Sequence, residues 1–288
     1  MYNTAKYFAW LDVNESTPFH IKITVLYSCM FSSLLYSVEA WGDTEKFKEK
    51  VLATERKLLK KCLGVKSGTH NDLIYHEVKR PDLIAIIKDR QYKFFKKISV
   101  LSAEDSMVKS VTNLYNKYMG ENTDSKIMYY SKLSGNEKEV NKSQRLNLID
   151  SSDRSSIVTY RSVVGTGFNH VLYKSNLNDE DRKIITRWRL SNHNLRVEKG
   201  RYTIPFTPRT GRVCIVCNVV EDEAHALFIC KIHHSIRIRF KLLLEHHPNV
   251  QSLLNPTSVC NASVIASYLR HIENSIDLTY GYMPTKRR

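Results

Sequence analysis

The sequence predicts a mainly α-helical protein, and two observations support this fold class. Apolar residues recur at helical spacing over the long stretches 47–63 and 83–101, with charged residues at the other positions. Residues that begin or end helices border these stretches, namely Gly64 after the first and Pro81-Asp82 before the second. With 288 residues and 42% hydrophobic composition, the chain is long and apolar enough to fold, with room for two domains.

The first predicted element is the uncharged stretch 23–38. Serines and tyrosines interrupt it, and it is shorter than the roughly 20 apolar residues that a membrane span requires. We therefore expect a buried helix here and no membrane segment.

The helices predicted over 47–63 and 83–101 combine an apolar face with a lysine-rich exterior. In the first helix the apolar face contains Val51, Leu58 and Cys62. A run of charges is usually a solvated face, but two successive lysine-rich helices also suit contacts with phosphates. Both interpretations stay open.

A polar segment divides the chain into two predicted domains. Residues 120–145 are rich in Ser, Asn, Lys and Glu, which is typical of a linker. We expect one helical domain over 1–119 and a second over 146–288. In the second domain, Asn178 and the three acids after it are typical of a helix start, and the apolar residues of 264–272 indicate a closing helix.

Four potential metal ligands form a C-x2-C-x7-H-x4-C array: Cys214, Cys217, His225 and Cys230. Three thiolates and one imidazole can surround one Zn²⁺ tetrahedrally, so we predict a structural zinc site in a small knuckle at about residues 201–232. Protein groups would fill all four coordination positions, which leaves no position for an activated water. A chance cluster is the alternative. His233 or His234 could also replace His225, but neither explains the H-x4-C step.

The chain is strongly basic, with 44 Lys and Arg residues against 29 Asp and Glu residues and a formal net charge of +15. This charge favours a polyanionic partner, nucleic acid first and an anionic membrane second. Residues 182–212 hold nine basic residues and one acid, Glu198. They also hold Trp188, Tyr202 and Phe206, planar side chains on which unpaired bases can stack, although most aromatic residues, Trp188 among them, are core residues.

An unpaired arginine has no place in a core, so we expect the arginines of this region to face a nucleic acid. The partner would be RNA, DNA or both, single-stranded or as a primer-template. The candidate contacts are Arg187, Trp188, Arg189, Arg196, Arg201, Arg209 and Arg212, together with Lys57, Lys60 and Lys61 of the first lysine-rich helix.

Three segments of the chain carry a family resemblance. Ile-Thr-Arg-Trp-Arg-Leu-Ser-Asn-His-Asn-Leu at 185–195 precedes the cysteine array, Leu-Leu-Tyr-x-x-Glu-x-Trp stands at 34–41, and Arg-Lys-Leu-Leu-Lys-Lys-Cys-Leu-Gly follows at 56–64. In chain order, with 34–41 first, 56–64 second and 185–195 ahead of the cysteine array, the segments resemble the C-terminal part of non-LTR (LINE-type) retrotransposon reverse transcriptases. The resemblance covers about residues 5–119 and 170–245.

The resemblance implies a thumb-like domain over 1–119 and a connector with a CCHC zinc knuckle over 146–288. In those RNA-directed DNA polymerases the thumb grips the primer-template duplex, and the knuckle end engages template RNA or target DNA. The aspartates that hold catalytic Mg²⁺ in the family's palm are not matched, because the chain has no Asp-Asp pair and Asp12 has no partner. We therefore expect a nucleic-acid-binding fragment without catalytic residues, palm or nuclease.

Other interpretations stay open. The chain could be a subunit or a truncated part of an active reverse transcriptase, a protein-interaction module organised by zinc, or the remnant of a mobile element. Nothing before the first predicted helix resembles a signal peptide, so we expect reduced thiols and an intracellular location, nuclear or cytoplasmic.

Overall fold

The computed structural model describes residues 6–7, 9–11, 17–36, 38, 45–104, 107, 109–110, 113, 135–152, 155–164 and 168–281. Asp12 and residues 120–134 of the predicted linker lie outside them. Most described residues are helical, which confirms the mainly α class. In chain order the named helices are α2 (Phe19–Val25), η1 (Leu26–Phe31), α3 (Ser32–Leu34), α5 (Glu45–Leu63), α6 (Asn71–Val78), α7 (Leu83–Glu104), α10 (Glu137–Ser151), α11 (Ser155–Val164), α12 (His170–Lys174), α13 (Asp179–Arg189), α14 (Arg196–Lys199), η2 (Arg209–Gly211), η3 (His225–Ile229), η4 (Lys231–His233), α15 (His234–Arg239), α16 (Lys241–His246), α17 (Val250–Leu253) and α18 (Val259–Tyr280).

The predicted helix borders are confirmed where their signals were strongest. Helix α5 ends at Leu63, and the next residue, Gly64, has a φ of 72°, in the left-handed region that glycine adopts without strain. Helix α7 follows Asp82, whose carboxylate accepts a hydrogen bond of 2.9 Å from the backbone N–H of Ala85. Helix α13 begins after Asn178, whose side chain accepts a hydrogen bond from the N–H of Glu180. None of the described helices combines the length and the apolar character that crossing a membrane requires.

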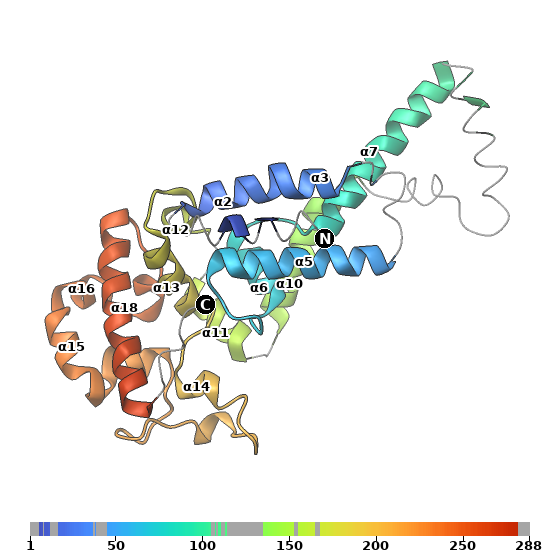
Figure 1. Cartoon of the computed structure of the whole chain (residues 1–288). Helices are drawn as coiled ribbons and strands as arrows, with labels where there is room; N and C mark the ends of the chain where they lie inside the picture. Colours follow the sequence, from blue (N-terminus) through green and yellow to red (C-terminus); the bar gives the residue numbers. More distant parts are fainter. Residues whose placement is uncertain are drawn as a thin grey trace.

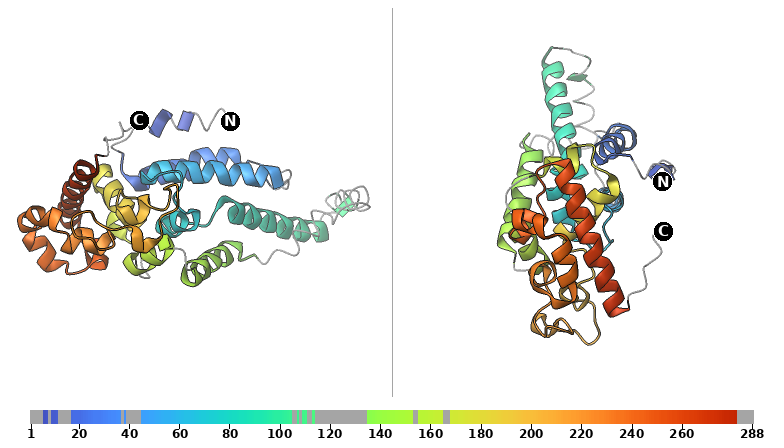
Figure 2. Two further views of the ribbon diagram at one scale, coloured as in Figure 1. Left: turned by 90° about the horizontal axis from the view of Figure 1, so that it is seen from below. Right: turned by 90° about the vertical axis from the view of Figure 1, so that its left-hand side faces the viewer.

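The helices form an elongated molecule (Figures 1 and 2). Helices α2 and α5 pack against each other, and the far end of α7 projects away from the remaining helices. Helices α15, α16 and α18 form the opposite end, where α18 packs along α13. Helix α13 also contacts α5, α11 and α12, so it lies where the two ends meet.

One hydrophobic core runs through both predicted domains. Leu58 and Leu63 of α5, Trp188 of α13 and Leu269 of α18 are fully buried members of one continuous cluster. The described parts of 1–119 and 146–288 therefore share their core.

The last nine residues of the predicted linker form part of a packed helix. Residues 137–145 belong to helix α10, which packs against α6 and α7. Its polar side chains are paired with acids of the first domain: Asn141 donates to Asp82 at 3.1 Å, Arg145 forms an ion pair with Asp82, and Lys138 forms one with Asp89 at 2.7 Å. The composition resembled that of a linker because the partners are remote in the sequence. Asp82 lies 59 residues before Asn141, and Asp89 lies 49 residues before Lys138.

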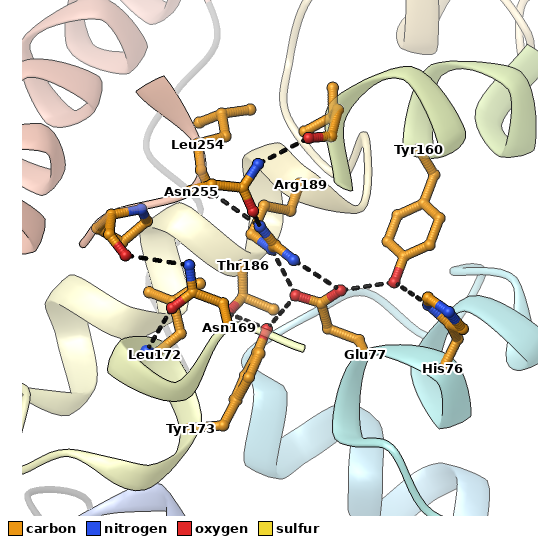
Figure 3. A network of polar contacts seen from close by, with 12 residues as sticks. His76, Glu77, Tyr160, Asn169, Leu172, Tyr173, Thr186, Arg189, Leu254 and Asn255 are labelled. Atoms are coloured by element: carbon orange, nitrogen blue, oxygen red, sulfur yellow. Dashed lines mark hydrogen bonds and ion pairs between the residues drawn. The ribbon is translucent and has the colours of Figure 1, made fainter. Parts of the chain in front are cut away.

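A buried ion pair joins α6 to α13 (Figure 3). Glu77 and Arg189 are each almost fully buried, and the guanidinium of Arg189 donates to both carboxylate oxygens of Glu77. Tyr160 of α11 and Tyr173 of α12 donate to the same carboxylate, and Arg189 also donates to the Leu254 carbonyl at 2.9 Å. Burial alone would raise the pKa of Glu77, but the Arg189 charge and these hydrogen bonds hold it below its ordinary value.

A second buried pair joins α2, α5 and α13. Asp179 accepts from Lys22 at 2.7 Å and from Arg182 at 2.7 Å, and all three side chains are nearly inaccessible to solvent. Arg182 donates in addition to the Cys62 carbonyl at the end of α5, at 2.6 Å. Two buried ion pairs thus connect α13 to the first predicted domain.

Glu55 of α5 is a buried carboxyl group with hydrogen-bond donors around it. It accepts from Tyr27 at 2.8 Å, from Tyr75 at 2.7 Å and from the N–H of Leu83 at 3.0 Å. Burial outweighs these hydrogen bonds and raises the pKa of Glu55 to about 7.

We expect Arg189→Met to destabilise the fold by about 3–5 kcal/mol, because the substitution leaves the Glu77 carboxylate buried without its cation. Urea unfolding measures the change. The control is Lys241→Met, which removes an exposed cation 3.7 Å from Glu245 and should cost less than about 1 kcal/mol. The double variant Glu77→Leu/Arg189→Met should recover part of the loss, because no buried charge remains. Equal stabilities of Arg189→Met and Lys241→Met would contradict the role of this pair.

We also expect Glu55 to make stability depend on pH. Because the pKa of Glu55 is higher in the folded than in the unfolded chain, the protonated carboxyl contributes stability that is fully present below pH 4.5. This contribution is lost as the pH rises toward about 7. Within that window Glu55 should lower the unfolding free energy by about 1.4 kcal/mol per pH unit. Urea unfolding at pH 5 and pH 8 should show a larger fall for the wild type than for Glu55→Gln, which does not ionise. Identical falls would show that Glu55 does not titrate in this range.

Candidate metal centre

The first two cysteines lie on a tight turn. The N–H of Cys214 donates to the Val219 carbonyl at 2.8 Å, and the N–H of Asn218 donates to the Cys214 carbonyl at 2.9 Å. Asn218 has a φ of 54°, a left-handed conformation that Asn tolerates better than most residues. The bridge between Val213 and Val220 closes the turn, which directs both thiols to one side.

A π-helical turn, η3, brings in the other two ligands. The side chain of Asp222 accepts from the N–H of His225 at 2.9 Å and so caps the start of the turn. At its end the N–H of Cys230 donates to the His225 carbonyl at 2.7 Å. Ala226 and Leu227 lie between them in the hydrophobic core, which anchors the turn to the rest of the molecule.

The four side chains converge. One ligand atom from each of Cys214, Cys217, His225 and Cys230 lies within 4.8 Å of all the others. The Sγ of Cys230 is 3.7 Å from that of Cys214 and 4.0 Å from that of Cys217. A tetrahedral ion with metal–sulfur bonds of about 2.3 Å would separate two sulfurs by about 3.8 Å, so the cluster can hold a metal ion. The cysteines are free thiols, since a disulfide would need a distance of about 2 Å.

His225 supplies independent support for a metal. Its Nε2 is buried and has no hydrogen-bond partner among the residues that the structure describes, which is costly for a polar atom unless a bound group occupies its lone pair. The alternatives to His225 are not in the cluster. His233 is buried but bonded through Nδ1 to Ser275 at 3.0 Å, and His234 is exposed.

The electrostatics of the cluster suit metal coordination. The N–H of Lys231 donates to the Sγ of Cys217 at 3.4 Å and lowers the pKa of that thiol. Burial lowers the pKa of His225, so its imidazole is neutral and able to donate a lone pair at neutral pH. Burial raises the pKa of Cys230 to about 12, a preference that a bound cation would reverse by stabilising the thiolate. A metal ion held by all four side chains would have no coordination position left for a water molecule.

Two acids that the sequence analysis missed connect the centre to the segment 191–196. Glu221 accepts from the N–H of Arg196 at 2.8 Å and from the Tyr280 hydroxyl at 2.6 Å. Glu223 accepts from the Ser191 hydroxyl at 3.1 Å and is paired with His193 at 2.9 Å. Both carboxylates are buried. Their position in the sequence is a signal that could have indicated this role, because acids just before a predicted ligand are unusual in a basic region.

Three of the predicted nucleic-acid contacts are wrong. Trp188 is fully buried and donates to Glu273 at 3.1 Å, so it has no face for a base. Arg189 is buried against Glu77. Arg212 is 5% exposed and donates to the carbonyls of Val197 and Thr207. For Trp188 and Arg189 the expectation failed because the acids that bind these side chains lie in other parts of the chain, whereas Arg212 is bound by carbonyls of its own segment.

The remaining candidates are at least partly accessible. Arg187 is half-buried and paired with Glu273 at 3.0 Å, Arg201 is paired with Glu198 at 2.9 Å, and Arg209 lies 3.7 Å from Asp222. Arg196 donates to the Val213 carbonyl beside the centre. On α5, the candidate Lys57 is exposed, whereas Lys60 and Lys61 are partly buried. The structure does not gather these residues into one surface.

Comparisons of the chain with protein-family models, with curated proteins and with solved structures find no match. The resemblance noted in the sequence accordingly stays a prediction.

We expect Cys217→Ser to lose bound metal. Cys217 supplies one of four ligand atoms, and a hydroxyl is a much poorer ligand than a thiolate for an ion held by sulfur. Elemental analysis of purified protein should find about one metal ion per wild-type chain and much less in the variant. The matched control is Cys260→Ser, an exposed cysteine outside the cluster, which should keep the wild-type content. Unchanged metal in Cys217→Ser would remove this residue from the ligand set.

Proposed function

We propose that the chain is a nucleic-acid-binding protein whose Cys214–Cys230 centre holds a structural Zn²⁺. Three thiolates and one imidazole in a closed set are typical ligands of structural zinc. Binding of Zn²⁺ would supply part of the folding free energy of the knuckle, because the knuckle contributes few residues to the hydrophobic core apart from Ala226 and Leu227.

The observation that carries the binding function is the surplus of positive charge. The 29 acids cannot neutralise 44 basic residues, even if every acid were paired. Part of this charge lies on exposed faces, at Lys46, Lys50 and Lys57 of α5 and at Lys93, Lys96 and Lys97 of α7. A surface with this charge binds phosphates through release of counterions.

Within this proposal, the role is that of the thumb, connector and zinc-knuckle end of a non-LTR retrotransposon reverse transcriptase. The sequence resemblance at 34–41, 56–64 and 185–195 supports it. The helical class and the Cys3His cluster are compatible with such an end piece. The part assigned to this chain is binding of RNA or DNA, and no catalytic residue is assigned to it.

A second candidate function is a protein-interaction module organised by zinc. Ile204 and Phe206 are 99% and 67% exposed, and Ile215 and Val216 of the Cys214–Cys217 turn are each more than half exposed. Large apolar side chains exposed close together are typical of surfaces that contact a partner. The charge surplus favours nucleic acid as the first candidate.

We expect the full chain to bind fluorescent single-stranded RNA with an affinity that falls steeply with salt. The logarithm of the association constant should fall by about 0.7 per neutralised phosphate for each tenfold rise in salt. Fluorescence anisotropy across a salt series measures the slope. Removal of zinc by a chelator should weaken binding, because the segment 191–196 is held by Glu221 and Glu223 beside the centre.

The controls separate the two candidate functions. A duplex DNA and a single-stranded DNA of equal length show which nucleic acid is preferred. Acidic polymers such as poly-glutamate show how much of the binding is charge alone. Absence of salt-sensitive binding to any nucleic acid, with zinc bound, would refute the proposed function and favour the protein-interaction module.

A further inference from the structure

A cavity of about 750 Å³ lies where the two predicted domains meet. One wall is the loop 66–70, which connects α5 to α6, and the other is formed by residues 190–193 and 198–202 around α14. We call it the Tyr202 pocket. Its walls are hydrogen-bonded to each other: Asn192 accepts from the N–H of Lys66 at 3.2 Å and donates to Thr69 at 2.8 Å. The pocket is therefore already formed in the folded chain.

The Tyr202 pocket is lined by more cations than anions. Lys66, Lys199 and Arg201 line it, and the acid among the lining residues is Glu198, whose carboxylate is 2.9 Å from Arg201. Lys66 and Lys199 are exposed. Partial desolvation lowers the pKa of Lys66 most, and the neighbouring charge of Lys199 lowers it further. An anionic ligand would relieve this repulsion.

An aromatic side chain and apolar residues complete the lining. Tyr202 is 74% exposed, and its backbone N–H donates to the Lys199 carbonyl at 3.1 Å, which places the two residues on one tight turn. Its hydroxyl lies 3.9 Å from the position that a Cβ would take on Gly68, across the pocket mouth. Leu73 and Leu190 are buried lining residues. The pocket thus offers cations for a phosphate and an aromatic ring with apolar neighbours for a base.

We propose that the Tyr202 pocket binds one nucleotide of a single-stranded nucleic acid. Lys66 and Lys199 contact its phosphate, and Tyr202 stacks on its base. A base within a duplex is covered on both faces, so stacking on Tyr202 requires an unpaired base. The inference rests on the proposed nucleic-acid-binding function. It brings Tyr202, which the sequence analysis named as a stacking side chain, together with Lys66 and Lys199, which were not among the candidate contacts.

The test compares variants of the full chain by fluorescence anisotropy with a single-stranded RNA and a single-stranded DNA of equal length. We expect Lys66→Ala/Lys199→Ala to weaken binding about tenfold and to reduce the salt slope by about 1.4, from two lost phosphate contacts. Tyr202→Ala should weaken binding about tenfold through lost stacking. It should leave binding of a duplex unchanged.

Matched controls remove the same groups elsewhere. Lys174→Ala/Lys241→Ala takes two exposed lysines from α12 and α16, and Tyr36→Ala takes an exposed tyrosine, none of which line the pocket. These controls should bind within about twofold of wild type. Circular dichroism verifies that every variant keeps its helices.

The outcomes separate this inference from the proposed function. If the wild type binds single strands with salt sensitivity but the pocket variants bind as well as their controls, the pocket inference is overturned and the proposed function stands. If the wild type binds no nucleic acid, both fail. If Tyr202→Ala weakens duplex binding as much as single-strand binding, stacking on an unpaired base is overturned.

Discussion

The buried ion pair between Glu77 and Arg189 is the interaction on which the arrangement of this chain depends. Removing two charges from water is costly, and their attraction offsets the cost only when further hydrogen bonds satisfy the remaining donors and lone pairs. Tyr160, Tyr173 and the Leu254 carbonyl provide these bonds, each from a different part of the chain. The free-energy cost of burying the pair is therefore low only when α6, α11, α12 and α13 are all in place (Figure 3). The pair thus favours the correct packing of these four helices over other arrangements.

The metal centre takes its position from the same helix. Beyond Arg189, the last residue of α13, the chain turns into the segment whose Ser191, His193 and Arg196 are bonded to Glu223 and Glu221 just before the ligand His225. On the other side, the Tyr280 hydroxyl of α18 binds Glu221, and α18 itself packs along α13. The knuckle is thus attached through buried carboxylates at its base, so that a metal ion bound there would order a unit that is already oriented.

Local features were predictable from the sequence, and remote pairings were not. The helices α5, α7, α13 and α18 followed from apolar spacing and from capping residues, and the four ligands followed from spacing alone, because both depend on neighbours within one or two turns. The polar run that became α10 and the arginine at 189 were misread for a common reason, whereas Arg212 is bound by the nearby carbonyls of Val197 and Thr207. A charged side chain looks exposed in a sequence when its partner, such as Glu77 for Arg189, lies 112 residues away.

Pairing of this kind also determines where the positive charge of the chain can act. Because Arg189, Arg182 and Arg212 are used inside the fold, the local excess of basic residues in 182–212 is not a measure of the charge offered to a ligand. The cations that remain accessible at the Tyr202 pocket belong to both predicted domains, since Lys66 follows α5 and Lys199 ends α14. A ligand held between them would bind only the assembled chain, and mass action would then stabilise the junction that Glu77 and Arg189 form in the core. Helix α13 would link binding of this ligand to the packing of the two predicted domains. It carries Arg189 of the buried ion pair, and the residues directly after it form a wall of the pocket.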